Sequence, residues 1–474
     1  MPSHRIASPR AGRPRRARLP LLGLLAAPLL CPAPTEAADY FVGARTQLTA
    51  DRWRGTRHEP VERLDVRPRL RLGVFDLEDD GAATDRFRFV ADLEVGADFG
   101  RTQAERDASK QVLGETRRAQ FDLYFAYFEG HLVQRRSLGL TVVAGRHLLL
   151  DAVGLDAVDG VTVRVAVPFV RLEGTGGLAV RSGWSNVGPD IYSPDGTLLH
   201  DVPAYLVGAA AETDLGDRVV FRGAWRRQFE DASHVQRDEV GGGLEVTPLR
   251  GLSFSAGTRF DAIFRRVANL EAGAGYSFLD AWRAEVAWRR EHPTFSADSI
   301  WNAFSIEPYH DVSGRLRFDP GLWRLSADGG VRRFDGGEPH AAAGAIETTR
   351  NAYDGGLRGE RLLGAPEDDM AVGAEGRAGL GYGGRRIYGD VFGRMPIALK
   401  PGVAPLRLGG RLGAVHFEDE QQAELSGVSG WAVATVGWKA AESVELELLG
   451  EGHASRFTPF RGRLFAQVTL EEWL

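Results

Sequence analysis

The chain has 474 residues, a formal net charge of −6, 43% hydrophobic residues and 26% charged residues. These proportions belong to an ordinary folded protein, and they exclude both a disordered chain and a bundle of membrane helices. The acidic balance argues against nucleic acid as a partner, and the 59 glycines are unfavourable for a largely helical fold.

The N-terminal segment differs from the rest of the chain. A basic head with six arginines and no acid precedes the apolar stretch LPLLGLLAAPLL at 19–30, and small residues follow. This layout is typical of a secretory signal peptide. We therefore predict a signal peptide over residues 1–37 and one mature domain over 38–474. Cleavage would remove Cys31, the only cysteine, so that the mature chain could form no disulfide.

A period of two in the hydrophobic pattern runs through the mature chain. In 86–99 (RFRFVADLEVGADF), seven alternate positions from Phe87 to Phe99 are apolar, and five of the other seven positions are charged. Side chains alternate across a strand, so this segment predicts a strand with one apolar and one charged face. The same alternation recurs at 64–74, 161–167, 282–291, 323–332 and 444–455.

These segments are too long for ordinary strands. Strands of soluble proteins usually have about 5–6 residues, whereas about 9–11 residues let a tilted strand cross a bilayer. Short turns such as 134–136 and 174–177 alternate with long polar connections such as 101–118, 186–202 and 293–309, as in outer-membrane barrels. A soluble β-sandwich would also alternate, but it would desolvate the charged face of each strand.

Because a membrane allows no open sheet edge, such a sheet must close on itself. We predict an all-β fold, a single closed antiparallel transmembrane β-barrel of about 22 strands, within a range of roughly 18 to 24, since bacterial barrels have even strand numbers.

Two segments carry a family resemblance. The last strand, RLFAQVTLEEWL at 463–474, alternates in its apolar residues and has the aromatic Trp473 next to its end. Gly-Arg-His at 145–147, followed by Asp-Gly-Val at 159–161, is similar to a hairpin of porin-like and alginate-export-type barrels, with His147 in place of their Gln. The chain thus resembles the Gram-negative outer-membrane β-barrel proteins of porin type. The resemblance implies an outer-membrane location, insertion by the barrel-assembly machinery, and passive or facilitated diffusion.

If the apolar faces point to lipid, the charged faces line a water-filled lumen, where rings of fixed charge select ions by sign. Inward arginines and acids on neighbouring strands could instead pair and only hold the wall together. The same phase also places Arg226 inside. The predicted lumen-lining residues are Arg67, Arg69, Arg71, Arg86, Arg88, Asp92, Glu94, Asp98, Arg164, Arg283, Glu285, Arg289, Arg315, Arg317, Arg324 and Asp328.

The polar connection 293–309 is the candidate constriction loop, because loops of this length in compact proteins are often functional. It contains Phe295, Trp301, Phe304 and Tyr309, whose rings could stack on sugars if the loop folds inward. A self-packed external cap is the alternative.

Motifs for catalysis, metals and cofactors are missing from the sequence. The 11 histidines form no His-Glu-x-x-His pair, and there is no Gly-x-Ser-x-Gly elbow. We expect no enzyme activity and no cofactor. The sequence predicts a porin-like outer-membrane channel of a Gram-negative bacterium for small hydrophilic solutes. A polysaccharide or oligosaccharide export or uptake channel and a plugged structural or adhesion barrel remain as alternatives.

Overall fold

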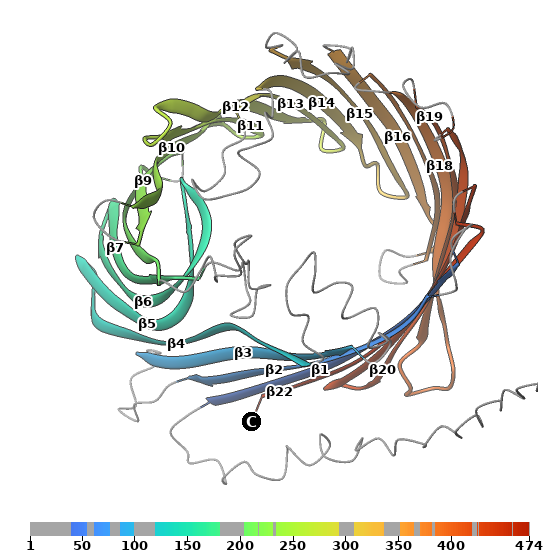
Figure 1. Cartoon of the computed structure of the whole chain (residues 1–474), viewed down its shortest axis with the longest axis horizontal. Coiled ribbons are helices and arrows are strands. Elements are labelled where there is room, and N and C mark those ends of the chain that lie inside the picture. The colour runs from blue at the N-terminus through green and yellow to red at the C-terminus, as the bar shows by residue number, and fades with distance from the viewer. Residues whose placement is uncertain are drawn as a thin grey trace, which may run out of the picture.

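The computed structural model describes residues 39–54, 61–75, 86–98, 119–180, 203–216, 218–230, 234–292, 308–335, 351–364, 370–381, 384–419, 424, 426–456 and 458–473. These residues form 22 antiparallel strands in one sheet. The sheet closes because β1 (Asp39–Arg54) pairs both with β2 (Val61–Phe75) and with the last strand, β22 (Phe460–Trp473). Figure 1 shows the resulting ring of strands. The predicted closed barrel of about 22 strands is confirmed. The predicted signal peptide lies outside the described residues.

Each strand pairs with the strand before it and the strand after it. The bounds of the remaining strands are β3 (Phe87–Asp98), β4 (Ala119–Arg135), β5 (Leu138–Asp151), β6 (Gly154–Val167), β7 (Val170–Ala179), β8 (Tyr205–Asp214), β9 (Val219–Phe229), β10 (Val235–Leu249), β11 (Leu252–Asp261), β12 (Arg266–Phe278), β13 (Trp282–Glu291), β14 (Tyr309–Phe318), β15 (Trp323–Phe334), β16 (Asn351–Leu362), β17 (Ala371–Leu380), β18 (Gly384–Ile397), β19 (Leu406–Asp419), β20 (Gly427–Ala441) and β21 (Val444–Ser455). No helix in the described part of the chain is long and apolar enough to cross a membrane.

Every second connection lies at the same end of the barrel, because neighbouring strands are antiparallel. One end has the tight turns 136–137, 168–169 and 250–251. The turn predicted at 174–177 is wrong, since these residues lie inside β7. Their glycines have another use. Gly177 of β7 and Gly160 of β6 lie directly opposite each other, and a Cβ on either residue would collide with the backbone of the other strand.

Contacts between distant strands identify the inner face of the wall. Arg226 on β9 bonds to Asp151 on β5, and Arg237 on β10 bonds to Asp156 on β6, although β7 and β8 separate these strands in the sheet. Side chains can meet over such a separation only on the concave side. The face of Arg226 is therefore the inner face, and the strand register extends this assignment to the charged residues of the other strands.

The outer face is a belt of exposed apolar side chains. Leu64, Val286 and Val312 are 37%, 53% and 48% exposed. Aromatic rings lie at the end of this belt: Trp282 packs on Phe318 with ring centroids 4.3 Å apart. A surface like this one is unfavourable in water. In a membrane, acyl chains would cover the apolar belt, and the aromatic residues would lie at the membrane–water interfaces.

We predict that Gly160→Ala lowers the free energy of unfolding by about 1–3 kcal/mol, the usual cost of overpacking. The added methyl would meet the backbone of Gly176 and Gly177. The matched control is Gly174→Ala on β7, because a Cβ at Gly174 has open space around it. Urea unfolding in lipid vesicles, followed by tryptophan fluorescence, measures both. Equal midpoints for the two variants would contradict the close approach of β6 and β7.

Candidate functional site

The hairpin of β5 and β6 leaves the barrel wall. β5 pairs with β4 only as far as Arg146, and β6 pairs with β7 only from Val158 onward. Residues 147–157, which we call the hairpin tip, therefore pair within the hairpin and are not part of the ladders to β4 and β7. At the edge of the tip, the Val180 N–H after β7 donates to the Ala157 carbonyl oxygen at 3.1 Å. In Figure 1, β5 to β9 curl into a small lobe at one side of the ring.

Arg226 fastens the hairpin tip to the inner face of β9. Its guanidinium donates to Asp151 at 2.7 Å, to the carbonyl oxygen of Gly154 at 3.1 Å, and to Asp156. Arg237 on β10 also donates to Asp156, at 2.7 Å. Only 1% of Arg226 is exposed, and a buried guanidinium is stable only when carboxylates compensate its charge.

The contact between tip and wall is close enough to require a glycine. A Cβ on Gly241 of β10 would collide with the backbone of Ala152 and Val153 in the turn of the hairpin. A glycine at this position lets two backbones touch. The hairpin tip is thus seated directly on β10.

A small dry core lies beneath the hairpin tip. Leu149, Val158 and Leu206 form a buried hydrophobic cluster, with 3%, 0% and 1% exposure. The opposite face of the tip is accessible, since Leu150 is 81% and Leu155 is 50% exposed. The hairpin tip is therefore apolar on both faces: one face packs on the inner wall, and the other adds apolar surface on the side away from it.

The Gly-Arg-His and Asp-Gly-Val segments at 145–147 and 159–161, which carry the family resemblance, form the base of this hairpin. Gly145 pairs with Gly160 and Arg146 pairs with Asp159 across the two strands. The Arg146 Nη2 lies 2.5 Å from the Asp159 carboxylate, and its Nη1 donates to the Leu123 carbonyl oxygen of β4 at 3.0 Å. Asp159 lies in the middle of β6. The ion pair stands at the point where the hairpin bends away from β4.

The predicted arginine row of β2 meets the predicted acids of β3. Arg69 lies 2.5 Å and Arg71 3.1 Å from the Asp92 carboxylate, which is completely buried. Arg67 lies 3.8 Å from Glu94. These groups neutralise each other, as expected if pairing holds the wall together.

Most of the other predicted lumen residues are also paired with an inner-face partner. Arg86 precedes β3, and Asp98 ends it with a side chain outside the described residues. The pairs are Arg88–Glu129 at 2.9 Å, Arg164–Glu173 at 2.7 Å, Arg283–Glu285 at 2.7 Å, Arg289–Glu291 at 3.6 Å, Arg324–Glu360 at 3.5 Å, and Asp328 with Arg377.

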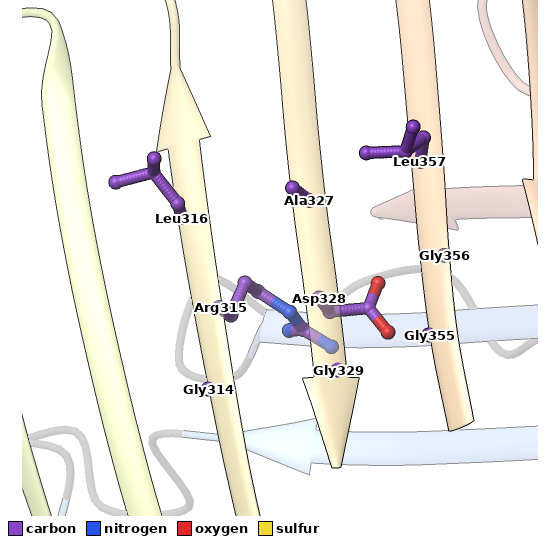
Figure 2. A pocket seen from close by; sticks show the side chains of 9 residues that line it. All are labelled: Gly314, Arg315, Leu316, Ala327, Asp328, Gly329, Gly355, Gly356 and Leu357. Atoms are coloured by element: carbon purple, nitrogen blue, oxygen red, sulfur yellow. The ribbon is translucent and has the colours of Figure 1, made fainter. Parts of the chain in front are cut away.

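Arg315 and Arg317 of β14 are exceptions. Neither has a carboxylate within ion-pair distance in the part of the chain that the structure describes. Arg317 also lies directly opposite Arg283 of β13, and like charges at such positions repel. Figure 2 shows that the carboxylate of Asp328 points away from Arg315, in agreement with its pairing to Arg377. In this part of the inner wall, Arg283, Arg315 and Arg317 of β13 and β14 lie beside a single acid of these two strands, Glu285. We call these three arginines the cationic patch, because positive charge is in excess there.

The predicted constriction loop cannot be placed as a whole, because Phe295, Trp301 and Phe304 lie outside the described residues. The assignment of Tyr309 to this loop is wrong, since Tyr309 is the first residue of β14. Its hydroxyl donates to Glu291 at 2.8 Å, and Arg332 lies 4.5 Å from its ring centroid. Pairing with β13 draws this residue into the wall.

Sequence reasoning missed the hairpin tip. The signal is in HLLLDAVGLDAV at 147–158, where apolar residues occupy both alternating phases. A strand that only forms the barrel wall has one face toward water. A segment whose side chains are apolar on both faces must therefore also pack against protein on its inner face.

Within the described residues, no group of three or more His, Cys, Asp or Glu side chains could hold a metal ion. No protein-family model and no curated protein matches the chain. Several solved structures match it over most of its length. OccAB4 of Acinetobacter baumannii is 9% identical with a TM-score of 0.44, over 92% of this chain and 98% of that chain.

A BenF-like porin from Pseudomonas fluorescens Pf-5 is 13% identical with a TM-score of 0.46, over 93% of this chain and 99% of that chain. OccK8 (OprE) of Pseudomonas aeruginosa is 10% identical with a TM-score of 0.42, over 92% and 99%. Similarities at this level carry no conclusion about function, which has to follow from the chain's own geometry.

We predict that Arg226→Ala releases the hairpin tip. Breaking a buried ion pair on one side costs about 3–5 kcal/mol, because the partner charges stay behind. Chymotrypsin cleavage after Leu148, Leu150 or Leu155 in protein reconstituted in vesicles should then become much faster. The control is Arg222→Ala, on the same face of β9, whose partners Glu212 and Glu245 lie on the neighbouring strands. Equal cleavage rates in both variants would show that Arg226 does not hold the tip.

Proposed function

We propose that this chain is a porin-like channel for the passive or facilitated diffusion of small hydrophilic solutes. The observation that carries this proposal is the exposure of the inner face. Arg67, Arg283 and Arg324 point inward and yet remain 47%, 54% and 51% exposed. Packed protein inside the barrel would bury these guanidiniums, so their exposure supports a water-filled lumen and argues against a plugged adhesion barrel.

The outer membrane of a Gram-negative bacterium is the location that fits this chain. The exposed apolar belt on the outer face needs a lipid environment, and closed barrels of this kind are typical of bacterial outer membranes. The predicted signal peptide at 1–37 would direct export. Insertion by the barrel-assembly machinery follows from such a location.

Two features of the lumen would act on a passing solute. The hairpin tip occupies part of the inner space and exposes Leu150 and Leu155 there. The cationic patch of Arg283, Arg315 and Arg317 attracts anions, because fixed charges in a pore select permeating ions by sign. Elsewhere the arginines and acids of the wall largely neutralise each other and contribute less to selectivity.

Single-channel recording in planar lipid bilayers tests the open lumen. The purified protein should insert and give discrete, ohmic current steps in potassium chloride. A water-filled pore carries ions of both signs, whereas a plugged barrel inserts without current. Vesicles into which the protein has been incorporated, as shown by protease protection, but which stay impermeable to ions would refute the channel function.

We predict that Arg315→Gln combined with Arg317→Gln shifts the reversal potential in a salt gradient toward that of a cation-preferring pore. Removal of unpaired charges leaves no buried carboxylate behind, so the barrel should keep its stability. Glu271→Gln on inner-face β12 is the opposite control, since this exposed acid also has no ion-pair partner among the described residues, and it should shift the potential toward anions. Unchanged reversal potentials in both variants would show that these residues do not determine the ion selectivity of the pore.

A further inference from the structure

A niche lies on the inner wall at the seam where the first and last strands meet. Its volume is about 420 Å³, within the range of about 300–1,000 Å³ that is usual for small-molecule sites. Residues of β1, β2, β21 and β22 line it. We call it the seam niche.

The floor of the seam niche is apolar. Phe465 of β22 and Leu449 of β21 are direct cross-strand partners there, with inward side chains. Within the described residues, the Phe465 ring has no aromatic or guanidinium partner. The inner-face ring of Phe392, by contrast, has the guanidiniums of Arg358 and Arg411 at 4.4 and 5.9 Å from its centroid. Phe465 is partly exposed and has no such cover, so a solute with an apolar face could pack on its ring favourably.

Each charged group of the seam niche has an ion-pair partner. Arg461 lies 2.5 Å and Arg463 3.5 Å from the Asp51 carboxylate, and Arg463 lies 3.7 Å from Glu451. The third acid of the lining, Asp65, lies 2.8 Å from Arg67 next to the seam niche. An ionised solute would have to open one of these pairs to be bound. A neutral solute would not, because each carboxylate and guanidinium keeps hydrogen-bonding capacity beyond its ion pair.

Neutral hydrogen-bonding groups complete the lining. Gln47 and Thr49 of β1 face the seam niche, and their side chains make no hydrogen bond within the described part of the chain. The seam niche therefore presents donors and acceptors next to the partly exposed ring of Phe465.

From this combination we infer that the seam niche binds a neutral polyhydroxylated ring, that is, a sugar. The C–H face of a pyranose would lie on Phe465, and its hydroxyls would bond to Gln47, Thr49 and the paired charges. The inference deepens the proposed channel function, because a weak site on the wall would hold a sugar during its passage. It rests on that function for its role, though not for its chemistry.

Ion-current recording with added maltose or glucose tests the site. In the wild-type channel, the sugar should reduce the current in a saturable manner. Phe465→Ala should raise the half-blocking concentration about tenfold, which corresponds to the loss of about 1.4 kcal/mol. Phe392→Ala is the matched control, with the same residue type on the same face but a covered ring, and it should behave as wild type. A non-saturable effect, or equal effects in both variants, would overturn the site.

Two further readouts separate this inference from the channel function. Saturation-transfer NMR with detergent-solubilised protein should show glucose ring protons in contact with the wild type and not with Phe465→Ala. This measurement needs no open pore, so sugar contact without ion current would refute the channel and keep the site. Benzoate in place of the sugar should not compete for the contact, and block by benzoate that depends on Phe465 would overturn the assignment to a neutral ligand.

Discussion

The need to keep every guanidinium and carboxylate of the strands in water or in an ion pair governs this barrel. Desolvating an isolated charge is prohibitively unfavourable, so the charged face of each strand cannot turn toward hydrocarbon. Backbone groups at a sheet edge cannot be left unpaired in a membrane either, and the pairing of β1 with β22 removes that edge. The polar lumen and the ion pairs of its wall, such as those around the buried Asp92, follow from these two requirements.

The hairpin tip departs from this scheme and shows what the scheme permits. Residues 147–157 are apolar on both faces, so they have no stable place in a wall with one wet side. They pack instead on the inner face of the next strands, where Leu149 and Val158 become buried with Leu206. A dry contact alone would leave Asp151 and Asp156 unsatisfied. Arg226 binds both acids, Arg237 adds the second positive charge at Asp156, and together they fix where the hairpin tip lies.

Alternation in the sequence predicted the strands well, because a strand between lipid and water must place apolar side chains on one face and polar side chains on the other. The predicted segments 282–291 and 444–455 coincide with β13 and β21. Alternation says nothing about register between strands. For this reason, the opposition of Arg283 to Arg317 and the pairing of Arg69 with Asp92 could not be derived, and Gly174–Gly177 was read as a turn. The seam niche was beyond reach because its lining comes from opposite ends of the chain.

Self-neutralisation of the wall has a consequence for selectivity. Where each charge has a partner, a passing solute meets little net field, and the few unbalanced places dominate. The cationic patch lies on β13 and β14, whereas the seam niche lies on β21, β22, β1 and β2, well separated round the ring of strands (Figure 1). On the two proposals above, an anion would be attracted to the first and would gain nothing at the second, where it would have to open an ion pair. A neutral sugar would have the opposite preference. Two solute classes would then use different parts of one wall without competing for the same side chains.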